Sequence, residues 1–229
     1  MTDTLDATFA VAWMNAAAAA LDAACPLLTE PAAARGDADH GVNMQRGFAA
    51  IATQLADEPP ATASDALLAA SKVLRRAMGG TSGPLWSAAL RRAGKTITDD
   101  PRSLADALAA AGAAVAELGG AAEGDNTMLD ALLPAARALE QQFDAGATPH
   151  DALTAAAHAA DEGARATAAR TAAKGRASYL GERGLGSPDP GATSAAIVVR
   201  SLLCVDLGRD AKALGERLDA EFHQERELV

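Results

Sequence analysis

The chain has 229 residues, of which 49% are hydrophobic and only 3% aromatic, and its formal net charge is −10. This length can bury a substantial core, and an alanine-rich composition with few aromatic and β-branched residues favours a domain built only from α-helices. The even excess of acidic residues argues against binding nucleic acid or an anionic membrane through a broad surface, because phosphate groups require clustered Lys and Arg.

Three further features predict a cytoplasmic globular protein. No apolar run approaches the ~18 residues that a membrane span needs. The N-terminal segment MTDTLDATF is acidic rather than basic, so it does not resemble a secretory signal. Cys25 and Cys204 lie far apart without metal-ligand spacing, which is typical of buried, reduced thiols.

Capping residues, glycines and prolines mark the predicted helices in chain order. The first runs from about Asp3 to Ala24 and stops near Pro26, and a glycine-bearing loop follows. The next begins around Gly41, and later ones have Ser64 as N-cap, Pro84 in the first turn, or Thr148 as N-cap before Pro149. The remaining predicted helices span 103–118, 128–143, 149–174, 192–205 and 209–225. No linker interrupts this series of about eight helices, so residues 1–229 are predicted to form a single domain.

The loop segment GDADHG offers two carboxylates, Asp37 and Asp39, which a turning backbone can aim at one point. Hard divalent cations such as Mg²⁺ prefer oxygen ligands, often one or two carboxylates together with phosphate oxygens. Alternatively, Asp37 forms an Asx turn and Asp39 caps the following helix. His40 is either a phosphate contact or a loop histidine satisfied by its surroundings. The other histidines, His150, His158 and His223, receive no role.

Two more loops have phosphate-binding character. GGTSGP places Thr81 and Ser82 among glycines at the start of a helix, where backbone N–H groups can face a phosphate, although the same residues also suit simple helix capping. In EGDNTML, Asp125 or Thr127 is expected to cap the next helix. The long segment from 174 to 194 gathers Lys174, Arg176 and Arg183 before DPGATS, which is either a solvated basic loop or a source of positive charge for phosphates.

Taken together, GDADHGVNMQRGF, GGTSGPL, GDNTMLDALLP and KGRASYLGER with DPGATS resemble, in the same order, the L subunit of dihydroxyacetone kinases over nearly the full length. The resemblance implies a barrel of eight antiparallel helices that holds ADP and two Mg²⁺ in loops at one rim. It also implies phosphate transfer to dihydroxyacetone bound on a separate K subunit. The phosphoryl donor is then either ATP or an M subunit of a phosphotransferase system, which rephosphorylates the bound ADP.

The resemblance also assigns roles to individual residues, and none of them acts as a nucleophile. Asp37 and Asp39 would bind Mg²⁺. The nucleotide would be bound by two groups of residues, one from the first two loops and one from the later loops. These are His40, Gly41, Val42, Asn43, Thr81 and Ser82, and then Gly119, Met128, Arg176, Asp189, Pro190 and Gly191. In-line transfer would rely on positioning and charge neutralisation.

One position departs from the family pattern. Where the family usually has a third metal-binding aspartate, this chain has Ala32, and Arg35 replaces a commonly apolar residue. Four explanations compete: Glu30 replaces the missing ligand, only one Mg²⁺ binds, activity is impaired, or the Arg35 guanidinium supplies positive charge where a second metal would sit. We expect nucleotide binding with an altered metal site.

The leading functional hypothesis is a kinase subunit for dihydroxyacetone or a related short ketose, since no segment of this chain is left to bind the ketose itself. The competing hypothesis is a non-catalytic, nucleotide-binding regulatory subunit, which Ala32 favours. A nucleotide domain like that of fatty-acid kinases ranks third. The donor, the ketose and the oligomeric state are not encoded in these motifs.

Overall fold

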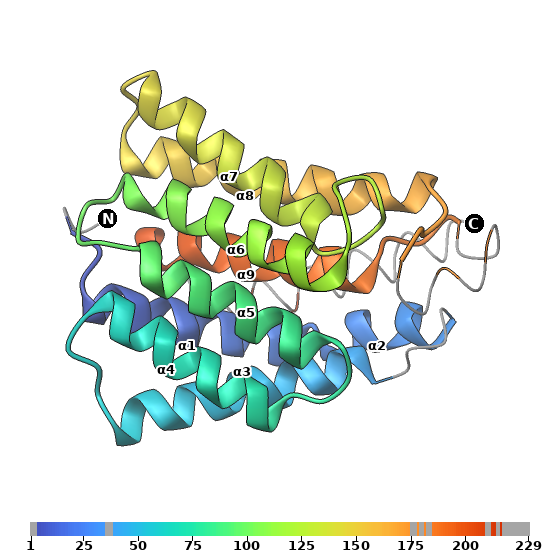
Figure 1. The fold of residues 1–229 in the computed structure, drawn as a ribbon, viewed down its shortest axis with the longest axis horizontal. Coiled ribbons are helices and arrows are strands. Elements are labelled where there is room, and N and C mark those ends of the chain that lie inside the picture. Colours follow the sequence, from blue (N-terminus) through green and yellow to red (C-terminus); the bar gives the residue numbers. More distant parts are fainter. Residues whose placement is uncertain are drawn as a thin grey trace.

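The computed structural model describes residues 4–34, 39–174, 178, 181, 185–208, 212, 213 and 216. In this part of the chain all regular structure is helical, as predicted (Figure 1). The α-helices are α1 (Ala7–Ala23), α2 (Cys25–Ala34), α3 (His40–Asp57), α4 (Ala63–Ala77), α5 (Ser82–Thr96), α6 (Ser103–Gly119), α7 (Leu129–Asp144), α8 (Pro149–Ala166) and α9 (Pro190–Leu207), with a 3₁₀ turn, η1 (Thr167–Ala169), after α8.

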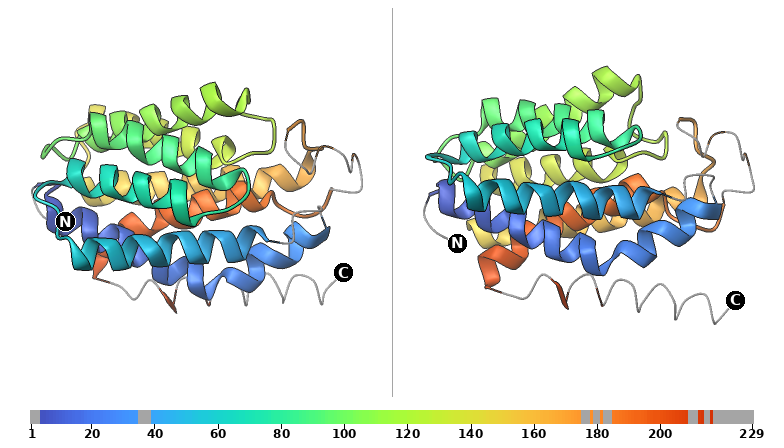
Figure 2. Two further views of the ribbon diagram at one scale, coloured as in Figure 1. Left: turned by 60° about the horizontal axis from the view of Figure 1, so that its bottom comes forward. Right: turned by 90° about the horizontal axis from the view of Figure 1, so that it is seen from below.

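Eight of these helices form a closed ring. From α3 to α9 each helix packs against the next one in the chain, and α1 closes the ring by packing against both α3 and α9. Neighbouring helices of the ring run antiparallel, and the two further views show their axes side by side (Figure 2). The expected barrel of about eight antiparallel helices is therefore confirmed. The remaining helix, α2, packs on α3 and α9 at one end of the ring.

Alanine is the most frequent buried residue in the described part of the chain, and it lines the contacts between helices. Larger side chains such as Phe48, Met14 and Met44 are fully buried between them. Small side chains let two helix backbones approach closely, and the extreme case is Gly163 on α8. A Cβ atom at Gly163 would lie 1.9 Å from the carbonyl oxygen of Asp130 on α7. No helix among the described residues is both long enough and apolar enough to cross a bilayer.

The first predicted helix ends next to the expected residue, Ala24, but the segment after it, which was predicted to be a loop, begins with a second helix. α1 ends at Ala23, and a second helix, α2, starts at Cys25 with Pro26 in its first turn. Proline is compatible with a first turn because the N–H it lacks has no helical partner there. Glu30 and Ala32 consequently lie on a helix rather than in a loop.

Two other capping and boundary predictions need correction. Thr62, not Ser64, caps α4, since its side chain accepts a hydrogen bond from the Asp65 N–H. The helix expected to reach Lys174 ends at Ala166. Thr148 does cap α8, with Pro149 in the first turn, as predicted. Most of the last predicted helix, 209–225, lies outside the described residues.

Neither Cys25 nor Cys204 forms a disulfide bond in the described part of the chain. Cys204 is buried, but Cys25 is only half-buried. The prediction of two buried thiols therefore holds for Cys204 alone.

Candidate nucleotide site

A cavity of about 440 Å³ lies at one end of the ring, where the start of α3 meets the connections α4–α5, α6–α7 and α8–α9. This volume suits a small organic ligand. These three connections carry three of the motif-bearing loops, and the GDADHG motif reaches the cavity through His40. The wall consists of His40, Thr81, Ser82, Pro84, Leu85, Trp86, Val115, Leu118, Gly119, Ala121, Asn126, Thr127, Met128, Lys174, Asp189, Pro190 and Gly191.

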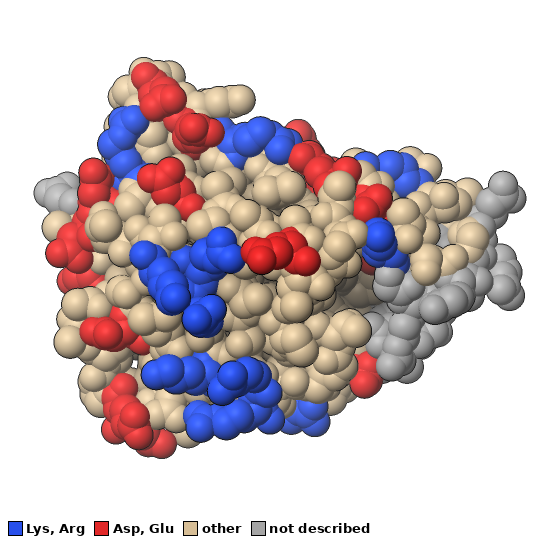
Figure 3. Space-filling model, viewed as in Figure 1, with Lys and Arg blue, Asp and Glu red and all other residues tan. Residues whose placement is uncertain are grey.

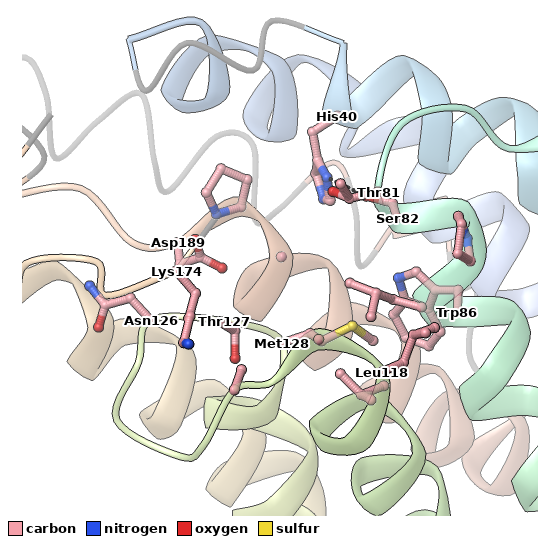
Figure 4. Close-up of a pocket in the computed structure, with 17 residues that line it drawn as sticks. His40, Thr81, Ser82, Trp86, Leu118, Asn126, Thr127, Met128, Lys174 and Asp189 are labelled. Atoms are coloured by element: carbon pink, nitrogen blue, oxygen red, sulfur yellow. Dashed lines mark hydrogen bonds between the residues drawn. The ribbon is translucent and has the colours of Figure 1, made fainter. Parts of the chain in front are cut away.

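The cavity has a polar side and an apolar side (Figure 4). Thr127, Lys174 and Asp189 lie on one side, while Trp86, Leu118 and Met128 lie on the other. A ligand that matches this wall carries anionic or hydrogen-bonding groups at one end and a flat apolar group at the other. A nucleoside phosphate has this distribution of chemistry.

His40, the first residue of α3, is buried and joins two other helices of the ring. Its ring nitrogens lie 3.3 Å from Ser82 Oγ, on α5, and 3.1 Å from Ser194 Oγ, on α9. Because Ser194 Oγ already donates to the Gly191 carbonyl, it accepts from His40 Nε2–H, which leaves Nδ1 to accept from the Ser82 hydroxyl. Burial lowers the pKa of His40 to about 4, so the ring is neutral near pH 7.

The α4–α5 turn brings the N-terminus of α5 to the cavity. Gly80 has a positive φ of 65°, and a Cβ atom at Gly83 would lie 2.3 Å from the Met78 carbonyl oxygen. This tight turn exposes Thr81 and Ser82 to the cavity at the start of a 15-residue helix. Backbone N–H groups at a helix N-terminus favour anionic ligands, and the Thr81 hydroxyl adds a further donor.

At the start of α7, Thr127 Oγ1 accepts a hydrogen bond from the Leu129 N–H at 3.2 Å, as expected of a capping residue, and further hydrogen bonds fix the α6–α7 loop. Asp130, in the first turn of α7, accepts from the N–H groups of Gly124 (2.8 Å) and Thr127 (2.9 Å). Asn126 has a φ of 58°, and its Nδ2 donates to the carbonyl oxygens of Thr167 and Arg170. Asp130 also pairs with Arg170 at 3.2 Å. These contacts tie the loop to the end of α8 and present Thr127 and Met128 to the cavity.

The N-terminus of α9 completes the wall. Asp189 is buried, and its Oδ1 accepts from the Ala192 N–H at 2.8 Å, so this aspartate caps α9. Its own N–H donates to Thr167 Oγ1 at 2.7 Å, which links α9 to the same 3₁₀ turn that holds Asn126. Lys174, an exposed residue of the α8–α9 connection, supplies positive charge close to Asp189 and Thr127 (Figure 4).

Eight of the twelve residues expected to bind a nucleotide line this one cavity. They are His40, Thr81, Ser82, Gly119, Met128, Asp189, Pro190 and Gly191. Three others lie on α3 outside the wall. Gly41 packs on α2, Val42 is 46% exposed, and Asn43 accepts a hydrogen bond from Arg46. Arg176 lies outside the described residues.

The metal-binding expectation can be followed only in part. Asp37 and Arg35 lie outside the described residues, and so does the side chain of Glu30. Asp39 is exposed directly before His40, at the N-cap position of α3, but its side chain makes no capping hydrogen bond. No cluster of three potential metal ligands occurs among the described residues. The role of Asp37 and Asp39 therefore stays a prediction.

Sequence reasoning missed the apolar side of the cavity. Trp86, Leu118 and Val115 follow helical spacing on α5 and α6, and this pattern alone looks like part of the core. Leu118 is nevertheless 56% exposed, and that exposure of a large apolar side chain could not be read from the sequence.

Comparison with known proteins identifies relatives of this arrangement. A family model described as the DAK2 domain matches residues 34–204. The chain is 32% identical to the ADP-binding subunit DhaL of the PEP-dependent dihydroxyacetone kinase 1 of Listeria innocua, over 87% of this chain and 97% of that protein. It is 45% identical to an L-erythrulose 1-kinase of Mycolicibacterium smegmatis, over 74% of this chain but only 30% of that protein.

The fold comparison agrees with these relatives. The dihydroxyacetone kinase of C. freundii superposes with a TM-score of 0.68 and 28% sequence identity, over 86% of this chain and 34% of that one. A second structure of that enzyme, in complex with AMP-PNP and Mg²⁺, gives a TM-score of 0.65. The chain thus spans about a third of the length of the erythrulose kinases and of this structural neighbour.

Proposed function

The chain belongs to the DAK2 domain family, and from this premise we propose that it is the Mg²⁺–ADP- or Mg²⁺–ATP-binding unit of a kinase for dihydroxyacetone or a related short ketose. It would pass phosphate to a ketose held on a separate K-type subunit. The donor is either ATP or an M-type phosphotransferase protein. The observation that carries this proposal is the single cavity, with its polar and apolar sides, formed by the start of α3 and three connections distant in sequence.

The residues of the wall fit a nucleoside diphosphate. The hydroxyls of Thr81 and Thr127 are available in the wall as hydrogen-bond donors to phosphate oxygens, and the Lys174 ammonium adds a cation beside Thr127. Trp86 and Met128 provide an apolar surface for a base. When bound, Mg²⁺ neutralises phosphate charge. Asp39 would be one of its ligands together with Asp37, because carboxylate oxygens are what this cation prefers.

In this proposal the chain contributes positioning and charge rather than a nucleophile. His40 holds the Ser82 hydroxyl through a neutral ring, and Asp130 holds the loop that carries Thr127. Both arrangements are made by the chain's own groups, and donors held in this way need little reorganisation when phosphate moves.

The test combines calorimetry with reconstitution. ADP should bind with micromolar or better affinity in the presence of Mg²⁺, and the loaded chain should phosphorylate dihydroxyacetone when mixed with a K-type subunit and either ATP or a phosphorylated M-type subunit. Absence of any heat of ADP binding would refute the nucleotide site. ADP binding without ketose phosphate from either donor would favour the regulatory alternative, which the alanine at position 32 motivates.

The metal stoichiometry needs its own measurement. Native mass spectrometry of the ADP complex should distinguish one Mg²⁺ from two. If Glu30 replaces the missing ligand, Glu30→Ala will remove one bound Mg²⁺ from a complex that otherwise holds two. An unchanged count in Glu30→Ala would exclude that role for Glu30.

A further inference from the structure

Basic side chains gather over α4 and α5 on one face of this acidic protein (Figure 3). We define the basic face as Lys72, Arg75 and Arg76 on α4 together with Arg91, Arg92 and Lys95 on α5. All six residues are exposed. The two helices pack side by side, and Ser87 on α5 donates a hydrogen bond to the Ser71 carbonyl on α4, so the two groups of cations share one surface.

Within the part of the chain that the structure describes, only Arg92 of this basic face has an ion pair, 3.1 Å from Glu117 on α6. That pair is itself largely exposed and contributes little to stability. Arg75, Arg76 and Lys95 lie in the last turns of their helices, where positive charge interacts favourably with the helix dipole. This explanation does not extend to Lys72, Arg91 and Arg92, which lie nearer the middle of their helices. Like charges so placed repel each other.

Acidic residues border the basic face at one end, and they restrict the class of partner that can bind there. Asp65, at the start of α4, and Asp99 and Asp100, just after α5, place exposed carboxylates at the end of the hairpin away from the cavity. A long polyanion such as nucleic acid, or an anionic bilayer, would meet these carboxylates and the acidic remainder of the chain. A compact acidic patch on another protein is small enough to contact the basic face without meeting these carboxylates.

The other end of the basic face leads to the cavity. The hairpin turn that joins α4 to α5 carries Thr81 and Ser82 into the cavity wall. A protein docked on this face therefore has one edge beside the cavity mouth, where a phosphoryl group would have to be exchanged. A charged surface with little exposed apolar area suits fast, reversible association.

We propose that the α4–α5 basic face is an electrostatic docking surface for an acidic face of the protein that exchanges phosphoryl groups with this chain. This inference rests on the proposed function. It adds where that partner binds and what chemistry its surface has.

The test measures the rate constant for phosphate transfer to a K-type subunit, and from an M-type subunit, at several salt concentrations. Arg91→Gln should lower kcat/KM for one of these partner proteins about threefold at low ionic strength, and adding Lys72→Gln should lower it about tenfold. Both differences should vanish near 0.5 M salt, where charges are screened over a few ångströms. Gln141→Glu, on the exposed surface of α7, makes the same change in net charge as Arg91→Gln and serves as the matched control.

The outcomes separate this inference from the proposed function. ADP affinity should be equal in wild type, Arg91→Gln and Gln141→Glu, because neither residue lines the cavity. If the wild type transfers phosphate and Arg91→Gln behaves like Gln141→Glu at every salt concentration with both partners, only the docking inference is wrong. If the wild type binds ADP and transfers nothing, both are wrong. Tighter binding of a fluorescent 20-base-pair DNA duplex by wild type than by Arg91→Gln would assign the face to nucleic acid and overturn the proposal.

Discussion

At the scale of single residues, the cavity depends on side chains whose partners are already in place. His40 connects Ser82 and Ser194, and Asp130 connects the N–H groups of Gly124 and Thr127. Each arrangement provides hydrogen-bond partners for buried polar groups. A buried polar group left without a partner would cost about 1–3 kcal/mol. Rigid walls of this kind lower the entropy cost of ligand binding.

Lys174 gives a prediction at this scale. Lys174→Met should weaken ADP binding about tenfold but leave adenosine binding within twofold, because the ammonium acts on the phosphates and not on the base. Isothermal calorimetry measures both. Lys72→Met removes the same charge from the basic face, away from the cavity, and should leave ADP affinity unchanged. Equal loss in the two variants would mean that only net charge matters.

The sequence allowed the polar side of the cavity to be predicted better than the apolar side. Thr81, Ser82 and Asp189 stand in glycine- and proline-bearing loops, and polar residues in such loops suggest a site. Trp86 and Leu118 stand on amphipathic helices, where apolar residues normally indicate core. Only the three-dimensional arrangement shows that the ring of helices ends there and leaves these side chains at a cavity.

At the scale of helices, close approach between α7 and α8 gives a second prediction. Gly163→Ala should destabilise the protein by about 2–3 kcal/mol, because the new Cβ would collide with the backbone of Asp130, 1.9 Å away, and the helices must separate. Gly112→Ala is the control, since its Cβ would meet the flexible end of Leu133. Urea denaturation should show a much smaller change there. Equal stability of the two variants would contradict this reading of the α7–α8 contact.

The pairing of α8 with α9 gives a prediction about pH. Asp161 on α8 hydrogen-bonds Arg200 on α9, yet burial raises the pKa of Asp161 despite that partner. A carboxyl whose pKa is higher in the folded state stabilises the protein below its unfolded pKa, and this contribution is lost as pH rises through the folded pKa. The stability of wild type relative to Asp161→Asn should therefore fall as pH rises from about 4 towards neutrality. Chemical denaturation of both proteins across this range measures their free energies of unfolding. A rise with pH in the stability of wild type relative to Asp161→Asn would contradict the assignment.

Helix boundaries could be predicted where a capping residue or proline has one usual role, as at Thr148 and Pro149. The predictions failed where a residue type has two structural roles. Pro26 was interpreted as a stop, but proline also suits a first turn, and α2 was missed for this reason. Ser64 was a plausible cap from its type alone. Its hydroxyl instead donates to the Gly94 carbonyl on α5, a contact that depends on the packing of α4 against α5.

At the scale of the whole molecule, the cavity should couple ligand binding to global stability. Its wall draws on four of the helices, α3, α5, α6 and α9, and on the connections α4–α5, α6–α7 and α8–α9, so ADP can bind only when these parts of the ring are assembled. At a ligand concentration of 100 times Kd, ADP with Mg²⁺ should add about 2.7 kcal/mol and raise Tm by about 5–10 °C. Differential scanning calorimetry measures the shift. EDTA should reduce it if Mg²⁺ is held with the nucleotide, and no shift at saturating ADP would contradict the site.

The closed ring itself could be expected only from family resemblance. Composition and capping predicted helices and a single chain-long unit. They do not specify that α1 fits between α3 and α9, because that contact joins segments far apart in sequence. Such closure depends on many small side-chain contacts, and no local pattern records it.

The alanine-lined interior carries a consequence for how this protein tolerates mutation. At the buried alanine positions little side chain is left to truncate, so loss of atoms is seldom the harmful direction there, unlike at the larger buried side chains such as Phe48 and Met44. Enlargement at these alanine positions is harmful, because added carbons force apart two closely packed backbones. Natural or laboratory variants should thus accumulate bulk on the outside of the helices and almost none between them.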